Sequence, residues 1–205
     1  YQAVTRIDRR HLVATVKIIS YAVDRERLDQ AAKLATNAMR MRPVAMRSAK
    51  LIVSQHSESD KELGHRAITQ RLEALCMTCD VEHVAHEESA IADALASATQ
   101  DLVLVLTASA TSDAHDVAPA AVKQAGGQVT RFGMPVDPGN LLFLGSYSDK
   151  PVIGLPGCAR SPALNGADWV LERVVCGVDV SDDDIAGMGV GGLLKESPAR
   201  PHPRE

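Results

Sequence analysis

Three segments of the sequence combine small residues with side chains that bind phosphate groups or metal ions. They are residues 107–116 (Thr-Ala-Ser-Ala-Thr-Ser-Asp-Ala-His-Asp), 135–139 (Pro-Val-Asp-Pro-Gly) and 154–162 (Gly-Leu-Pro-Gly-Cys-Ala-Arg-Ser-Pro). Small side chains let a ligand approach the backbone amides, and hydroxyl, carboxylate and guanidinium groups then bind it. The sequence therefore predicts that these segments form a site for an anionic ligand.

The carboxylates of the first segment have a spacing that suits a magnesium ion. Asp113 and Asp116 are three residues apart, so the two side chains can share a Mg²⁺ that also binds a phosphate. The alternative is that Asp116 caps a helix and that Asp113 is a solvated loop residue. The residues alone leave both interpretations open.

A group of cysteines and histidines gives a weaker signal for zinc. Cys76, Cys79, His83 and His86 are four zinc-ligand types, but only three residues separate the Cys pair from the His pair. Structural zinc fingers place about 12 residues between the two pairs, so the end of a helix followed by a strand is the favoured interpretation. Redox catalysis by the Cys-x-x-Cys pair is not expected, because a helix C-terminus raises the pKa of a thiol.

Spacing alone assembles no nucleophile with a histidine base. His115 lies next to Asp116, and Cys158 follows a Pro-Gly turn. Neither residue has a partner at a spacing that identifies a catalytic dyad or triad.

From residue 49 onward, the sequence predicts alternating strands and helices, and these elements must position the three segments. Aliphatic runs alternate with helical periodicity, which predicts strands at residues 51–54, 80–85, 101–106 and 128–132, with helices between them. Ser59 and Glu62 predict a capping box before the first of these helices. The most apolar run, 101–106, is expected to be a central strand. Since ligands of parallel sheets bind at the carboxyl ends of the strands, the three segments are expected to meet there.

The alternation of strands and helices stops after residue 132. Residues 141–144 and 151–153 are too close for a crossover helix, which predicts an antiparallel hairpin at one edge of the sheet with a turn over 145–150. Ser161 is predicted to cap a helix that has Pro162 at its first position, and Ser181 to start a further short helix.

Charge and composition divide the chain and exclude several classes of protein. Residues 1–50 contain 11 Lys or Arg against 4 Asp or Glu, a net charge of +7, so the rest of the chain carries −11 to reach the total of −4.

Only 3% of the residues are aromatic, which argues against nucleic-acid binding by base stacking. No apolar run approaches the roughly 20 residues that cross a bilayer. Four cysteines do not make a disulfide scaffold, so we expect a cytoplasmic protein.

Three regions are expected along the chain. Residues 1–48 read as a strand over 12–19, a helix over 28–39 and an extended stretch, and form a basic segment or small lobe. Residues 49–180 form the α/β domain, and 181–205 a short helix and a proline-rich linker. We expect the sequence to be a piece of a longer protein, because it begins with Tyr1 and stops among prolines.

The order of these motifs resembles the molybdopterin-binding domain family, which is shared by molybdopterin adenylyltransferases and molybdenum-insertion enzymes. The resemblance spans residues 49–177 and rests on a strand followed by Thr107 to Asp116, on Asp-Pro-Gly at 137–139, and on Gly-Leu-Pro-Gly at 154–157. Residues 157–162 and 188–194 are closer still to bacterial proteins in which this domain precedes a cytidylyltransferase-like nucleotidyltransferase module.

The resemblance implies an α/β fold, a three-layer α/β/α sandwich with a mostly parallel sheet and an antiparallel edge hairpin. It implies that the loops bind molybdopterin through its phosphate, with Mg²⁺ for adenylyl transfer in the catalytic members. The implied catalytic residues are Asp113 and Asp116, and the implied magnesium ligands are Asp113, Asp116 and Asp137. The implied substrate-binding residues are Thr107, Ser109, Thr111, Ser112, Pro138, Gly139, Gly157, Arg160 and Ser161.

This sequence departs from the family pattern at two places. The family's Thr-Gly-Gly-Thr-Gly loop appears as Thr-Ala-Ser-Ala-Thr at 107–111, without glycines. The acidic residue expected before the second helix is replaced by His86 or displaced to Glu87. We therefore expect binding of the pterin to persist and leave open whether the chain itself catalyses adenylyl transfer.

Three functions remain open from the sequence. The first is the presentation of molybdopterin to a fused nucleotidyltransferase module, with a nucleotide as a further ligand. The second is action on the pyrophosphate of a pyridine nucleotide or of ADP-ribose, and the third is a non-catalytic scaffold for oligomerisation. We expect a homo-oligomer, such as the trimers of the family, and neither a nucleic acid nor a membrane as partner.

Overall fold

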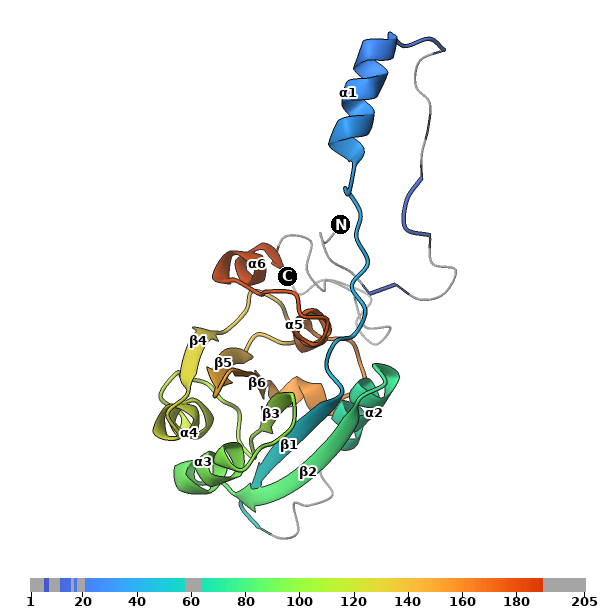
Figure 1. Cartoon of the computed structure of the whole chain (residues 1–205). Helices are drawn as coiled ribbons and strands as arrows, with labels where there is room; N and C mark the ends of the chain where they lie inside the picture. The colour runs from blue at the N-terminus through green and yellow to red at the C-terminus, as the bar shows by residue number, and fades with distance from the viewer. Residues whose placement is uncertain (1–5, 8–11, 16, 18–20, 58–63, 190–205) are drawn as a thin grey trace, which may run out of the picture.

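A computed structural model describes residues 6–7, 12–15, 17, 21–57 and 64–189 of the chain. Six strands form one sheet: β1 (Ser48–Gln55), β2 (Thr78–Ala85), β3 (Leu102–Leu106), β4 (Gln128–Phe132), β5 (Phe143–Tyr147) and β6 (Lys150–Leu155). Their spatial order is β2-β1-β3-β6-β5-β4 (Figure 1). The predicted central strand is therefore an inner strand of the sheet.

Helices cover both faces of this sheet. On one face lie α2 (Arg66–Ala74), the 3-10 turn η2 (Gly157–Arg160), α5 (Gly166–Val175) and α6 (Asp182–Gly187), and on the other lie α3 (Glu88–Ala96) and α4 (Val117–Gln124). The strand β3 shows why two faces are needed: Leu102, Leu104 and Leu106 belong to the first core, and Val103 and Val105 to the second. The chain is a three-layer α/β/α sandwich, as predicted.

The direction of the strands sets where the loops lie. β2, β1, β3 and β6 are parallel, whereas β5 runs antiparallel to both β6 and β4. The strand β4, at the edge of the sheet, is thereby parallel to β6. The carboxyl ends of β1, β2, β3, β6 and β4 consequently point to the same edge of the sheet, which we call the rim.

The predicted hairpin is present as β5 and β6, with a turn shorter than expected. Only Ser148 and Asp149 lie between the strands, and both have positive φ, 45° and 65°. Two residues in this conformation suit the twist of a tight hairpin, so Gly145 to Tyr147 remain in the strand. Gly154 of β6 is required for packing, because a Cβ there would lie 1.9 Å from the Phe143 ring.

The helix predicted from Ser161 begins later than expected. Ser161 follows η2, and α5 starts at Gly166 with Asn165 as its N-cap. The Asn165 side chain accepts a hydrogen bond from the Ala167 amide at 2.9 Å, and Asp168 accepts one from the Asn165 amide at 2.8 Å. The short helix predicted to start at Ser181 is confirmed as α6, and the structure adds a capping box between Ser181 and Asp184.

The N-terminal region contributes little to the core. The helix predicted over 28–39 is present as α1 (Arg25–Ala35), none of whose residues is buried. Of the strand predicted over 12–19, residues 12–15 and 17 are described and are not in a strand. The predicted capping box of Ser59 and Glu62 lies outside the described residues. Within the described part of the chain, no helix is long and apolar enough to span a membrane.

Candidate functional site

The three predicted segments all lie at the rim. They follow β3, β4 and β6, whose carboxyl ends share that edge. Arg160 Nη2 joins the third segment to the first by donating to the Thr107 carbonyl at 2.8 Å, and the Gly166 amide holds the second segment by donating to the Pro138 carbonyl at 2.8 Å. The Arg160 bond links the β3 loop to η2, and the Gly166 bond links the β4–β5 loop to the start of α5.

Two of the predicted ligand-binding hydroxyls hold the β3 loop in shape. Thr107 Oγ1 donates to the Ser109 carbonyl at 2.6 Å and lies 3.2 Å from Thr111 Oγ1. Both threonines are buried, whereas Ser109 and Ser112 are exposed. The hydroxyls of this loop that are open to a ligand are therefore those of Ser109 and Ser112.

The carboxylates of the loop also bind its own backbone. Asp116 Oδ2 accepts hydrogen bonds from the Ser112 amide at 2.6 Å and the Asp113 amide at 3.1 Å. Asp113 Oδ1 accepts one from the His115 amide at 2.6 Å. Asp137 lies in a different loop, and no three acidic, His or Cys side chains of the described residues gather as a metal site. The three carboxylates predicted to share one Mg²⁺ are thus not brought together as a cluster.

The β4–β5 loop contributes a sharp backbone turn beside α5. Asp137 and Pro138 are exposed and joined by a cis peptide bond, and Gly139 is buried with φ 130°. A Cβ at Gly139 would lie 2.7 Å from the Gly166 nitrogen, so only glycine allows the two backbones to approach in this way. Of the predicted residues here, Asp137 and Pro138 are accessible to a ligand and Gly139 is structural.

Arg160 is the predicted residue with an unsatisfied group. It ends η2, whose first residue, Gly157, is exposed. The Nη1 atom of Arg160 is buried and has no hydrogen-bond partner among the described residues. Burial lowers the pKa of Arg160 below its ordinary value. A cation in this condition is stabilised by any anion that can reach it.

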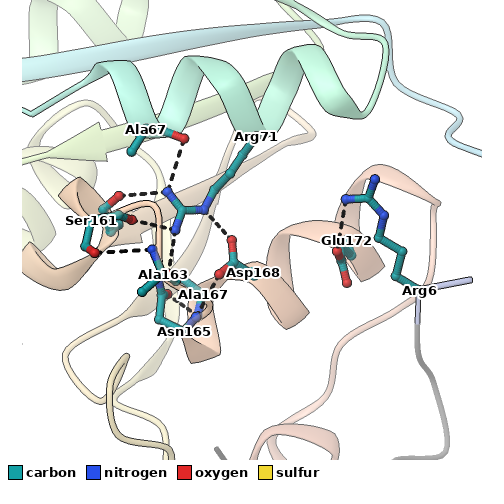
Figure 2. A network of polar contacts seen from close by, with 10 residues as sticks. Arg6, Ala67, Arg71, Ser161, Ala163, Asn165, Ala167, Asp168 and Glu172 are labelled. Carbon is teal, nitrogen blue, oxygen red and sulfur yellow. Dashed lines mark hydrogen bonds and ion pairs between the residues drawn. The ribbon is translucent and has the colours of Figure 1, made fainter. Parts of the chain in front are cut away.

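Arg71 of α2 explains why Ser161 does not begin a helix. Figure 2 shows its guanidinium beside Asp168, with which Nε forms an ion pair. Its Nη2 atom donates to the Ser161 carbonyl at 2.8 Å and the Ala163 carbonyl at 3.0 Å, and Nη1 donates to the Ala159 carbonyl at 2.9 Å. Because these carbonyls bind Arg71, residues 161–164 form a turn. The Ser161 side chain is exposed, and its hydroxyl accepts from the Ala163 amide at 3.2 Å.

A cavity of about 190 Å³ lies beside this network, between α2 and α5. Its lining includes Gln70, Arg71, Pro162, Asp168 and Glu172. None of the predicted ligand-binding residues lines it. The residues predicted to bind a ligand therefore lie away from this cavity.

The sequence indicated His86 only as a weak zinc-ligand candidate or as the replacement for the family's acidic residue, and not as a residue that contacts serines of β1 and the β3 loop. His86, directly after β2, lies with Nδ1 2.8 Å from Ser54 Oγ and with Nε2 3.0 Å from Ser109 Oγ. Its ring also makes an edge contact with His56, at 4.7 Å between centroids. One signal was present: Ser54 and His86 are polar residues at the ends of two neighbouring predicted strands, where ligand-binding groups of parallel sheets gather.

The cysteines of the weak zinc signal, Cys76 and Cys79, lie around the start of β2, whereas His86 follows its other end. Among the described residues no metal-binding group of three is found, and both ring nitrogens of His86 lie against serine hydroxyls. Burial, with Asp80 and Glu73 nearby, raises the pKa of Cys79 to about 11. A thiol with this pKa is neutral at physiological pH. The favoured interpretation of a helix end followed by a strand is confirmed, since α2 ends at Ala74 and β2 begins at Thr78.

Comparison with known proteins gives likenesses in structure alone. No family model and no curated protein matches the chain. Among solved structures, it is similar to the molybdopterin biosynthesis MoeA protein from Pyrococcus horikosii, at 15% sequence identity and a TM-score of 0.47. The match covers 70% of this chain and 36% of that protein, so the chain spans about a third of its length. A likeness at this level identifies neither the family nor the function of the chain.

Proposed function

We propose that this chain binds molybdopterin at the rim through the pterin's phosphate and presents it for nucleotidyl transfer in molybdenum cofactor biosynthesis. Two kinds of evidence support the proposal. The order of motifs in the sequence resembles the molybdopterin-binding domain family, and the loops that carry these motifs follow strands whose carboxyl ends share one edge of the sheet.

The unpartnered guanidinium nitrogen of Arg160 is the observation that carries the proposal. Arg160 bridges the β3 loop and η2 through Thr107, and its Nη1 atom has no partner among the described residues. A buried cationic group without a partner costs free energy, and a phosphate would recover it through charge-assisted hydrogen bonds. The phosphate would then lie at the junction of the two loops, near the exposed Gly157.

In this proposal two carboxylates, rather than the three that the family resemblance implies, bind magnesium. Asp113 and Asp116 are neighbours in one loop, and each has a carboxylate oxygen that no described residue contacts. These two oxygens, with the ligand's phosphate and water, suit a Mg²⁺ that arrives with the ligand, since Mg²⁺ retains several waters. Transfer of the nucleotide would be the task of a separate nucleotidyltransferase module.

The test is a titration of the purified chain with molybdopterin, with and without Mg²⁺, in the presence of ATP or CTP. Arg160→Gln is expected to weaken binding at least about tenfold, because it removes a charge-assisted contact. Arg66→Gln, which removes an exposed arginine of α2, is the matched control and should bind as the unmodified chain does. The pterin's fluorescence reports the dissociation constant.

The outcomes of this titration separate the three functions. Binding without turnover supports the proposal. Cleavage of ADP-ribose or a pyridine nucleotide, without pterin binding, would replace it with the pyrophosphate function. Binding of neither ligand would leave a scaffold, whose oligomeric state sedimentation would report.

A further inference from the structure

The ring of His86 is held in one orientation by the neighbouring strand. Its Nδ1 atom lies 2.8 Å from the hydroxyl of Ser54, at the end of β1. Ser54 is only 2% exposed and accepts a hydrogen bond from the Ala108 amide at 3.1 Å. The serine is thereby fixed between β1 and the β3 loop, so the imidazole it contacts is fixed as well.

The other ring nitrogen of His86 faces an accessible hydroxyl. Nε2 lies 3.0 Å from Ser109 Oγ, and Ser109 is exposed in the β3 loop. The backbone at Ser109 is held in place, because its carbonyl accepts the hydrogen bond from Thr107 Oγ1. A hydroxyl within hydrogen-bond distance of an oriented imidazole is the arrangement that activates a serine nucleophile.

The residues after Ser109 supply donors for a developing negative charge. Among the described residues, the amides of Ala110 and Thr111 have no hydrogen-bond acceptor. Asp116 holds the loop around them in place, because its carboxylate accepts hydrogen bonds from the Ser112 and Asp113 amides. A backbone amide directly after a nucleophilic serine is a common donor to the oxyanion of a tetrahedral intermediate.

We propose that Ser109 is the nucleophile, and His86 the base, of an acyl-transfer site that acts on carboxylic esters bearing an anionic group. The anionic group is inferred from Arg160, which binds the Thr107 carbonyl two residues before Ser109 and has an unpartnered Nη1. This inference goes beyond the proposed binding of molybdopterin and does not depend on it.

The proposed step is balanced in atoms and charge. Ser109 Oγ forms a bond to the carbonyl carbon of the ester while its proton passes to His86 Nε2. The bond from that carbon to the alcohol oxygen then breaks, and His86 returns the proton to the leaving alcohol. Water repeats the sequence on the acyl-serine, which releases the carboxylic acid and restores Ser109.

The surroundings of His86 favour the neutral form that this step needs. Burial lowers its pKa from the ordinary value of 6.5, and the nearby His56 lowers it further, while Asp116 opposes the shift. At neutral pH the ring is therefore uncharged. The step requires the tautomer that donates from Nδ1 to Ser54 Oγ, because the lone pair on Nε2 is then available to Ser109.

The test is covalent labelling of the whole chain with a fluorophosphonate, read by intact mass and peptide mapping. In this reaction Ser109 Oγ forms a bond to phosphorus, the P–F bond breaks, and fluoride and a proton leave. We expect one adduct, on Ser109. Ser109→Ala should abolish it, and His86→Gln should slow it at least about 100-fold, the usual contribution of a general base.

Controls keep the result interpretable if a variant folds poorly. Ser89→Ala removes an exposed serine three residues from His86 and should label like the unmodified chain. In the unmodified chain, the labelling rate should fall as the pH drops through the His86 pKa, below 6.5. The absence of an adduct, an adduct that persists in Ser109→Ala, or a rate independent of pH would each overturn the proposal.

A substrate pair tests the anionic group separately. The chain should hydrolyse mono-4-nitrophenyl succinate at least about tenfold faster than 4-nitrophenyl acetate, and Arg160→Gln should remove the difference. Equal rates for the two esters would contradict the assigned substrate class. Neither readout involves molybdopterin, so failure of pterin binding and failure of this inference are distinguishable.

Discussion

Asp116 lies directly before α4, yet its carboxylate turns away from that helix. It forms no side-chain cap and instead accepts hydrogen bonds from the Ser112 and Asp113 amides. The interpretation of Asp116 as a helix cap is thus confirmed in position only, and its role as a Mg²⁺ ligand stays a prediction. Its backbone is at the N-cap position of α4, but its side chain makes no capping hydrogen bond. Its Oδ2 atom instead accepts the two amides of the loop.

Two substitutions of Asp116 distinguish the contribution of its hydrogen-bond acceptor from that of its charge. Asp116→Ala removes the acceptor of two amides and should lower the free energy of unfolding by about 1–2 kcal/mol. Asp116→Asn retains an acceptor oxygen and should lower it by less than about 0.5 kcal/mol. Urea unfolding of both variants gives the comparison, and equal losses would show that the charge, rather than the acceptor, shapes the loop.

Single residues were the least predictable part of the site. The hydroxyls of the 107–116 loop look equivalent in the sequence, but Thr107 and Thr111 are buried while Ser109 is exposed. The pairing of His86 with Ser54 and Ser109 joins residues 32 and 23 positions apart. Such contacts depend on the register of neighbouring strands, which local residue patterns do not determine.

Secondary-structure elements were predicted well where periodicity and turn chemistry agreed. The strand over 128–132 and the helix start at Ser181 are confirmed because alternation, glycines and a capping serine each give the same answer. The start of α5 was wrong because Ser161 and Pro162 form a good local start signal. Arg71, 90 positions from Ser161, overrides that signal by binding the carbonyls of the turn.

A carboxylate between two strands predicts a dependence of stability on pH. Asp101, just before β3, accepts hydrogen bonds from the Arg47 amide at 2.7 Å and the Ser48 amide at 3.0 Å, where β1 begins. These bonds lower the pKa of Asp101 below 3.8. Its contribution to stability is therefore present above its ordinary pKa and is lost as the pH falls through the folded-state value.

The corresponding experiment is urea unfolding of the unmodified chain and of Asp101→Asn from about pH 6 to about pH 3. The unmodified chain should lose stability more steeply at the acid end, because only its Asp101 takes up a proton on unfolding there. Parallel curves for the two proteins would show that Asp101 does not couple the two strands.

At the scale of the whole molecule, the arm before β1 and the sandwich contribute unequally to the core. All described residues from 21 to 43 are exposed, and contacts with the sandwich begin with Val44 and Met46, which pack against the first core. The ion pair of Arg6 with Glu172, at 3.7 Å, is partly exposed, and exposed pairs contribute about 0–1 kcal/mol.

Deleting residues 1–41 is therefore expected to change the free energy of unfolding by less than about 1 kcal/mol. The amides of Ala45 and Met46, which both donate to the Val175 carbonyl, remain in the shortened chain. Thermal unfolding followed by circular dichroism measures the change. A large loss of stability would mean that the arm belongs to the folded unit and that the boundary expected near residue 48 is misplaced.

The overall architecture was predictable because alternating strands and helices admit few arrangements. A parallel sheet with helices on both faces follows from the β-α rhythm, and the short link between β5 and β6 forces the one reversed strand. The meeting of the three segments at the rim follows from that topology. Their internal hydrogen bonds do not, because they depend on side chains brought together only in the folded chain.

The tight turn at Ser148 and Asp149 lies at the end of the hairpin where β6 begins, opposite the rim. Both of its residues are exposed. A fluorophore or an immobilisation tag attached at this turn would be held rigidly by two paired strands while leaving the loops after β3, β4 and β6 uncovered. The hairpin turn is thus a suitable attachment site for single-molecule or surface-based assays of this domain.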